Sequence, residues 1–281
     1  MAAVASSDKK AADEVIAQLK EIFPPEPDVV DGKVKVRFWY NTNNGPRNVV
    51  RTISVPDWKS IKKNYEDKTL TDLQYLIEDF HAKSGGQLII MSGLPGTGKS
   101  YYLRSLLHSW RDWCTAEYVL DPENLFGHAQ GYMADVVLRD SYDEEYETFG
   151  DEEGKWKLLI LEDSGELLVP DAKDRVGQGL SRLLNLVDGL IGQGLRVLVL
   201  ITTNEEFDKL HSAVARDGRC AAAIQFNTFD RAKAEQWMNG SAPKLPDNKD
   251  KFTLAELYAL TKGTTVKKLE KESAGFGFRI R

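Results

Sequence analysis

The stretch Gly93-Leu94-Pro95-Gly96-Thr97-Gly98-Lys99-Ser100 decides how this sequence folds. It fits the pattern G-x-x-x-x-G-K-[ST], in which a glycine-rich turn joins a strand to a helix. The apolar run 87–91 precedes it, and apolar residues at helical spacing follow it over 99–113. The glycines let backbone N–H groups point at phosphate oxygens, and the helix N-terminus adds unpaired donors and partial positive charge. The stretch therefore predicts a phosphate-binding loop.

The last two residues of this stretch have specific expected roles. Lys99 is expected to bridge the β- and γ-phosphates of a nucleotide as a cation, and the Ser100 hydroxyl to bind Mg²⁺. A nucleotide and Mg²⁺ are therefore the expected ligands. The residues expected to bind them are Gly93, Leu94, Pro95, Gly96, Thr97, Gly98, Lys99, Ser100 and Tyr101.

Around this stretch, apolar runs of strand length alternate with helical segments. The strand candidates are 87–91, 116–120, 156–161, 196–202 and 222–226, and the helix candidates are 99–113 and 178–191. Because the strand runs are nearly all apolar, we expect a parallel sheet covered by helices on both faces. The pattern predicts an α/β fold with a parallel five-stranded αβα core over residues 85–228.

The residues before this core have a different pattern. Apolar residues at helical spacing over 12–19 predict a first helix, and two β-rich runs around a turn predict a hairpin over 34–55. A further helix is expected at about 70–83, before the chain breaks at Ser84-Gly85-Gly86. We therefore expect a small α+β accessory or substrate domain over residues 1–84.

The residues after the core are expected to form a short helical lid over 229–281. Its helices are expected at 229–238 and 253–261, with a polar break between them. A basic tail follows, and its cations are Lys262, Lys267, Lys268, Lys271, Arg279 and Arg281.

Two adjacent acids, Glu162 and Asp163, end the strand candidate 156–161. A nucleotide-hydrolysing site needs a carboxylate to hold Mg²⁺ and often a second one to orient the attacking water. Adjacent strand residues point to opposite faces, so two registers are open if the strand continues straight. In the favoured one, Glu162 binds the metal through water and Asp163 polarises the nucleophile. In the other, Asp163 binds the metal, and Glu162 or Glu166 acts on the attacking water.

Further candidates follow the next strand. Asn204 comes at the tip of 196–202, where its amide can both donate to and accept from a γ-phosphate and an attacking water. Arg216 and Arg219 are three residues apart just before the strand candidate 222–226. In a ring, they could reach the γ-phosphate of a neighbouring subunit and stabilise transition-state charge.

With these elements in order, residues 87–260 resemble the AAA+ ATPases. GLPGTGKS resembles the family's Walker A motif, Asn204 matches sensor 1, and residues 183–189 resemble the LLNxLDG stretch before it. Residues 215–219 resemble the arginine-finger segment, with Asp217 in place of proline. The Glu-Asp order of the acidic motif is similar to the mitochondrial Rieske-protein translocase branch.

The resemblance implies ATP hydrolysis by a ring, commonly of six subunits, around a central pore. It also implies a pore loop after the second strand of the core, which here is the region 125–133. Phe126 and Tyr132 are the candidate residues that grip a substrate. The pattern of the lid departs from the family, because no clear sensor 2 arginine is found.

Composition limits the class of protein. The 281 residues are 42% hydrophobic and 28% charged, which is typical of a globular protein. The net charge of −6 owes much to residues 143–154, which carry seven acids and no base.

Cys114 and Cys220 are too few for a disulfide scaffold or a four-thiolate zinc site. No apolar run reaches the roughly 18 residues of a membrane span, and the N-terminus has no signal-peptide pattern. We therefore expect a soluble, cytoplasmic protein.

The leading functional hypothesis is an oligomeric ATPase that remodels or translocates a protein partner. A helicase-loader or replication accessory ATPase is the alternative, since the basic tail and the lysines at 59, 62 and 63 could contact nucleic acid. A monomeric kinase or nucleotide switch is a third hypothesis, and it would not need Arg216 or Arg219 to act on a neighbour.

Overall fold

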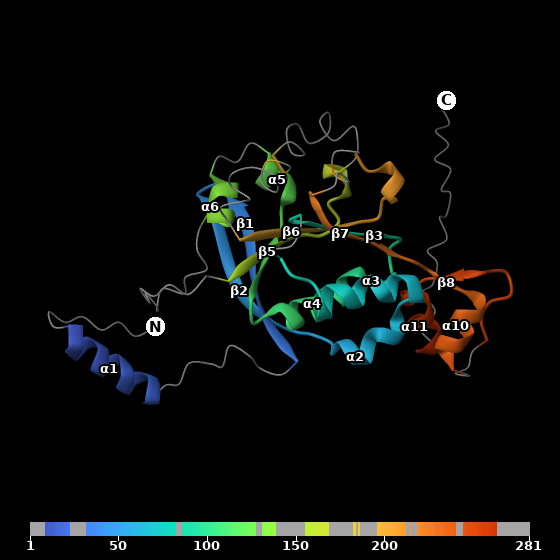
Figure 1. The fold of residues 1–281 in the computed structure, drawn as a ribbon, viewed down its shortest axis with the longest axis horizontal. Helices are drawn as coiled ribbons and strands as arrows, with labels where there is room; N and C mark the ends of the chain where they lie inside the picture. Colours follow the sequence, from blue (N-terminus) through green and yellow to red (C-terminus); the bar gives the residue numbers. More distant parts are fainter. Residues whose placement is uncertain are drawn as a thin grey trace, which may run out of the picture.

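The computed structural model describes residues 9–22, 32–82, 86–127, 131–138, 155–168, 182–183, 185, 196–211, 214, 218–239 and 244–262. A sheet crosses the molecule, with α2, α3 and α4 on one face and α5 and α6 on the other (Figure 1). This is the layered αβα arrangement that the alternating pattern predicts.

The sheet has seven strands in the order β2-β1-β4-β5-β6-β3-β7. The strands are β1 (Lys33–Thr42), β2 (Gly45–Ser54), β3 (Leu88–Gly93), β4 (Cys114–Val119), β5 (Trp156–Leu161), β6 (Val197–Thr203) and β7 (Cys220–Phe226). β1 and β2 pair antiparallel, and every other neighbouring pair is parallel. The α/β fold with parallel core strands is therefore confirmed.

The sheet differs from the expected core in the number of its strands, which is seven rather than five. The predicted hairpin, β1–β2, lies at the edge of the core sheet, where β1 pairs parallel with β4 and Phe38 lies opposite Tyr118. A two-stranded hairpin cannot bury its own apolar face. Val34 and Val36 instead pack in the same cluster as Ile89 of the core. Residues 33–82 of the segment expected as a separate domain thus share a sheet and a core with described residues of 85–228.

The helices on the first face continue this shared core. They are α2 (Trp58–Ile61), α3 (Asp67–Glu78) and α4 (Lys99–Trp110), with a 3₁₀ turn at Lys62–Asn64. Leu73 and Leu76 of α3 are fully buried. Their carbonyl oxygens accept hydrogen bonds from the Tyr102 hydroxyl at 2.8 Å and the Trp110 indole at 2.9 Å. These contacts fix α4, and with it the start of the helix at Lys99.

Shorter helices cover the opposite face. They are α5 (Pro122–Phe126), α6 (Tyr132–Leu138) and the 3₁₀ turns Gly165–Leu167 and Phe207–Lys209. The predicted N-terminal helix is α1 (Lys9–Ile22). The predicted helix 178–191 lies mostly outside the described residues, as do Arg216 and the basic tail after Lys262.

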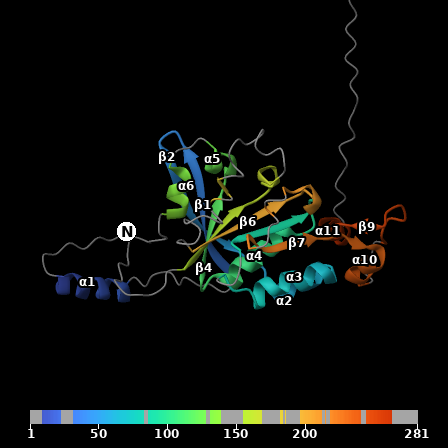
Figure 2. The same ribbon diagram turned by 45° about the horizontal axis from the view of Figure 1, so that its top comes forward.

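Residues 229–239 and 244–262 form a short lid, as the sequence predicts for this part of the chain. It consists of β8 (Phe229–Asp230), α10 (Arg231–Met238), β9 (Lys251–Phe252) and α11 (Leu254–Thr261). Both views place α10 and α11 together, beside the β7 side of the sheet (Figures 1 and 2). The lid has a small core of its own that includes Phe229, Met238, Phe252 and Leu257. No helix in the described ranges is long and apolar enough to cross a membrane.

Candidate functional site

The glycine-rich loop connects the end of β3 to the first residue of α4. Gly96 and Gly98 have φ angles of +83° and +99°, which favour glycine. At Gly93, a Cβ atom would lie 2.5 Å from the Phe226 carbonyl oxygen on β7. The Gly96 carbonyl accepts a hydrogen bond from the Ala255 N–H of α11 at 2.9 Å. The loop is therefore packed between the core and the lid, and glycine is required for its conformation.

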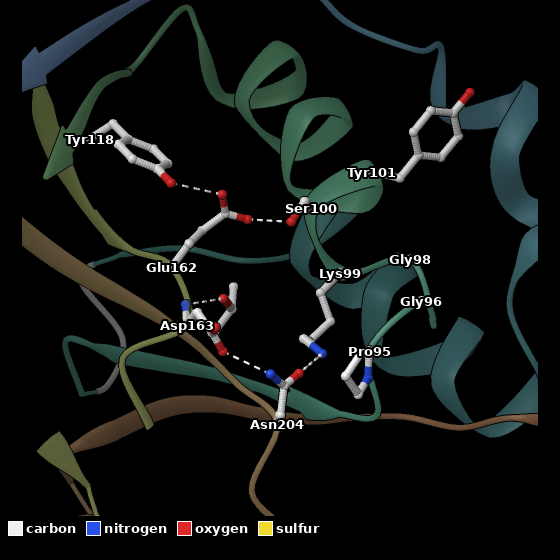
Figure 3. A pocket seen from close by; sticks show the side chains of 11 residues that line it. Pro95, Gly96, Gly98, Lys99, Ser100, Tyr101, Tyr118, Glu162, Asp163 and Asn204 are labelled. Atoms are coloured by element: carbon white, nitrogen blue, oxygen red, sulfur yellow. Dashed lines mark hydrogen bonds between the residues drawn. The ribbon is translucent and has the colours of Figure 1, made fainter. Parts of the chain in front are cut away.

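A cavity of about 510 Å³ lies against this loop. This volume is in the range of small-molecule sites. Residues from the loop, α4 and the carboxyl ends of β4, β5 and β6 line it (Figure 3). They are Pro95, Gly96, Gly98, Lys99, Ser100, Tyr101, Tyr118, Glu162, Asp163, Thr202 and Asn204.

Lys99 is held inside this cavity by neutral acceptors. Its Nζ donates to the carbonyl oxygens of Gly93 and Leu94, and to Asn204 Oδ1 at 2.9 Å. Burial lowers the pKa of Lys99, while the nearby Asp163 and Glu162 oppose that shift. An anion bound in the cavity would favour the charged ammonium. Among the described residues that line the cavity, Lys99 is the sole cation.

Glu162 faces the same side of the sheet as α4. Leu158 and Ile160 pack in the cluster on that face, and the strand alternation carries Glu162 to it. The Ser100 hydroxyl donates to Glu162 Oε1, and the Tyr118 hydroxyl donates to Glu162 Oε2 at 3.0 Å. Both carboxylate oxygens of Glu162 therefore accept hydrogen bonds beside the glycine-rich loop.

Asp163 also lies in the cavity, because the strand does not continue straight. Its φ angle of +54° turns the chain after Glu162. The Asp163 N–H donates to Thr202 Oγ1 at 2.9 Å, and Asp163 Oδ1 accepts from Asn204 Nδ2 at 2.7 Å. A chain of hydrogen bonds thus runs from Lys99 through Asn204 to Asp163. The two acids have different partners, although both face one cavity.

The donors of the cavity fit a nucleotide with Mg²⁺. The hydroxyl of Ser100 and the carboxylates of Glu162 and Asp163 supply oxygen ligands, which Mg²⁺ prefers. In the described part of the chain, no group of three or more His, Cys, Asp or Glu residues gathers as a metal site. Phosphate oxygens and water usually supply further ligands to Mg²⁺ in proteins.

The turn after Asp163 lies close against β6. Gly165 in this turn therefore provides a testable prediction. A Cβ at this position would lie 2.1 Å from Thr203 Oγ1, and Thr203 is itself 1% exposed. We expect Gly165→Ala to lower the free energy of unfolding by about 1–3 kcal/mol, because the core cannot yield to the added methyl group. Urea denaturation measures this.

Thr203→Ala removes the clashing oxygen and provides the matched test of that mechanism. The double variant Gly165→Ala/Thr203→Ala should be more stable than Gly165→Ala. If the second substitution only adds to the loss, the close approach to Thr203 is not the cause.

The remaining candidates lie away from this cavity. The Leu88 N–H donates to the Arg219 carbonyl at 3.0 Å, so Arg219 is at the amino-terminal end of β3, opposite to the loop. Phe126 and Tyr132 are both 0% exposed, and the Tyr132 hydroxyl donates to Asp121 Oδ1 at 2.6 Å. Their assignment as substrate-gripping residues is wrong, since the rings pack in the core under the segment after β4.

Two residues of the cavity were not predicted from the sequence, Tyr118 and Thr202. Each is a polar residue near the carboxyl end of a strand beside β5 or β3. That position was the available signal, because the carboxyl ends of parallel strands meet at one edge of the sheet.

The fold and the site together define a P-loop nucleotide-binding protein. Residues 89–228 match the family model described as ATPase family associated with various cellular activities (AAA). Such a domain is in general a nucleotide-hydrolysing ATPase. Residues 1–78 match a second model, described as a domain of unknown function, DUF5925.

No curated protein matches the chain significantly. One chain of the solved HORMA:CdnC:Trip13 complex of E. coli MS115-1 is similar, with 16% sequence identity and a TM-score of 0.43. The match covers 86% of this chain and 84% of that chain.

Proposed function

We propose that this protein binds Mg²⁺-ATP and hydrolyses it as a ring-forming AAA+ ATPase that remodels or translocates a protein partner. The observation that carries the proposal is the meeting of Lys99, Ser100, Glu162, Asp163 and Asn204 in one cavity at the glycine-rich loop. A structural role would not require a lysine, two carboxylates and an amide to gather there. ATP hydrolysis by the purified chain, followed as phosphate release, tests the proposal.

The residues of the cavity would divide the work of binding. The N–H groups of the loop and the start of α4 donate to phosphate oxygens, and Lys99 exchanges its carbonyl partners for them. Bound Mg²⁺ would neutralise charge that develops on the phosphates. Ser100 and Glu162 are the residues placed to hold it, because they already meet each other.

Asp163 and Asn204 are placed for the attacking water. Their mutual hydrogen bond positions a carboxylate and an amide together, beside Lys99. A carboxylate there can accept a proton from water, and the amide can orient that water toward the γ-phosphate. This arrangement supports the register in which Glu162 binds the metal and Asp163 polarises the attacking water. The same Glu-Asp order supports a relation to the Rieske-protein translocase branch of the family.

In a ring of six subunits, Arg216 and Arg219 of one subunit would complete the nucleotide site of its neighbour. Arg219 is separated from the loop of its own subunit by the length of β3, roughly 16 Å. A neighbouring subunit is therefore the expected recipient of its charge, with Arg216 as the second candidate. We place this assembly in the cytoplasm, with a protein client. Nucleotide-dependent hexamers in mass photometry test the ring, and monomers with ATP bound would favour a kinase or switch instead.

Arg219→Ala is expected to leave ATP binding within about twofold and to lower the hydrolysis rate by about 10³-fold, because an arginine finger stabilises transition-state charge. The rate of phosphate release and the affinity for a fluorescent ATP analogue measure the two effects.

Mixing two inactive variants gives the control. Lys99→Ala subunits are expected to bind ATP weakly but still carry Arg219, so adding them to Arg219→Ala subunits should restore part of the activity. The absence of any restoration in rings shown to contain both variants would contradict action on a neighbour.

The client can be sought with an ATP-trapped ring. The Asp163→Asn variant is expected to bind ATP without hydrolysing it. It would therefore retain the bound client during a pull-down. Stimulation of the wild-type ATPase by single-stranded DNA, but not by an unfolded protein, would favour the alternative function on nucleic acid.

A further inference from the structure

We propose that Tyr118 is a positioning residue for Glu162, and that Phe38 of the β1–β2 hairpin supports it. Tyr118 would hold the Glu162 carboxylate in the orientation that serves Mg²⁺. This inference rests on the proposed function, since it assigns Glu162 to the metal.

The Glu162 carboxylate is held from two sides. Ser100 of α4 donates to one oxygen, and Tyr118 of β4 donates to the other at 3.0 Å. Figure 3 shows the two hydroxyl groups approaching the carboxylate from opposite directions. If Ser100 turns its oxygen to a metal ion, Tyr118 is the remaining donor that fixes the carboxylate.

The length of the glutamate side chain explains why a second donor matters. Glutamate has one more rotatable bond than aspartate, so ordering its carboxylate costs more conformational entropy. A hydrogen bond from a phenol to a carboxylate offsets that cost and selects one rotamer.

The ring of Tyr118 is in turn supported by the hairpin. Phe38 lies directly opposite Tyr118 in the β1–β4 register, and the two ring centroids are 5.3 Å apart with a tilt of 44°. Phe38 belongs to residues 1–78, which match a different family model from the core. The hairpin is therefore connected to the Glu162 carboxylate through the Phe38–Tyr118 ring contact and the Tyr118 hydrogen bond.

The test measures how much Mg²⁺ strengthens nucleotide binding. The affinity of the full chain for fluorescent ADP is determined in Mg²⁺ and in EDTA, and the ratio of the two is the metal gain. Tyr118→Phe keeps the ring and removes the hydroxyl. We expect it to reduce the metal gain by about three- to tenfold, as for the loss of a typical intramolecular hydrogen bond, with the affinity in EDTA unchanged.

A double variant separates positioning from a general structural effect. The shorter carboxylate of Glu162→Asp should not reach Tyr118, so adding Tyr118→Phe to it should cause no further loss of metal gain. Tyr75→Phe removes a phenol hydroxyl from an exposed residue of α3, and it should match the wild type. Phe38→Leu should reduce the metal gain in the same direction as Tyr118→Phe, by a smaller factor.

Two results would overturn the inference. One is a metal gain in Tyr118→Phe equal to that of the wild type. The other is an equal further loss in the Glu162→Asp background, which would make the hydroxyl independent of Glu162. Failure of the proposed function looks different, because the wild type itself would then not bind ADP in either buffer.

Discussion

Lys99→Ala is expected to weaken ATP binding by at least about 100-fold and to reduce ATP hydrolysis to background. Removing a partly buried charged donor from a phosphate site costs about 3 kcal/mol or more, which corresponds to that factor. Lys99 is also the sole cation among the described residues that line the cavity, so no other described side chain there can replace its charge. Binding of a fluorescent ATP analogue and phosphate release measure the two effects.

Folding must be preserved for this result to concern binding. The partners of Lys99 are the carbonyls of the loop and the amide of Asn204, all at the edge of the cavity, so its loss should leave the thermal midpoint nearly unchanged. Lys33→Ala is the matched control, since Lys33 is an exposed lysine at the start of β1. Tight ATP binding by a folded Lys99→Ala variant would refute the assignment of the cavity.

Asp163→Asn is expected to lower ATP hydrolysis by about 10²–10⁴-fold while leaving ATP affinity within about threefold. A neutral amide cannot accept the proton of the attacking water, and positioned general bases contribute factors of this size. Asparagine is the right replacement because it tolerates the positive φ angle of +54° and keeps an oxygen for the Asn204 amide. Single-turnover hydrolysis and equilibrium binding measure the two quantities separately.

Glu162→Gln is the companion variant that distinguishes the two acids. It removes the charge beside Ser100, so we expect a higher Mg²⁺ requirement and a loss of metal gain. The opposite pattern, with ATP trapped by Glu162→Gln and the Mg²⁺ requirement raised by Asp163→Asn, would contradict the assignment and reverse the two roles.

The sequence by itself determined the local parts of this protein. The glycine spacing, followed by Lys99 and Ser100 between a strand and a helix, predicts a phosphate loop at 93–100, and the apolar runs predict the five core strands. The alternation over 34–55 predicts the hairpin, and the helical spacing after 229 predicts a short lid. Each of these depends on periodicity or turn chemistry within a few residues, which a single sequence displays directly.

The tertiary structure decided where these parts meet. The hairpin joins the core sheet because β1 pairs with β4, a contact between residues about 80 positions apart that no local pattern encodes. Phe126 and Tyr132 are buried. The sequence could not predict this, because an aromatic residue in a loop has the same local sequence pattern whether it faces a core or a pore.

The two adjacent acids show the same division most clearly. Their sequence order left two registers open, because strand alternation alone would send them to opposite faces of the sheet. Strand alternation carries Glu162 to Ser100 and Tyr118, and the positive φ angle at Asp163 then turns the chain so that Asp163 meets Asn204. The sequence determined which chemical groups are present at this edge of the sheet. The partners of each group follow from one backbone angle and from strand neighbours distant in the chain, and only the folded structure provides those.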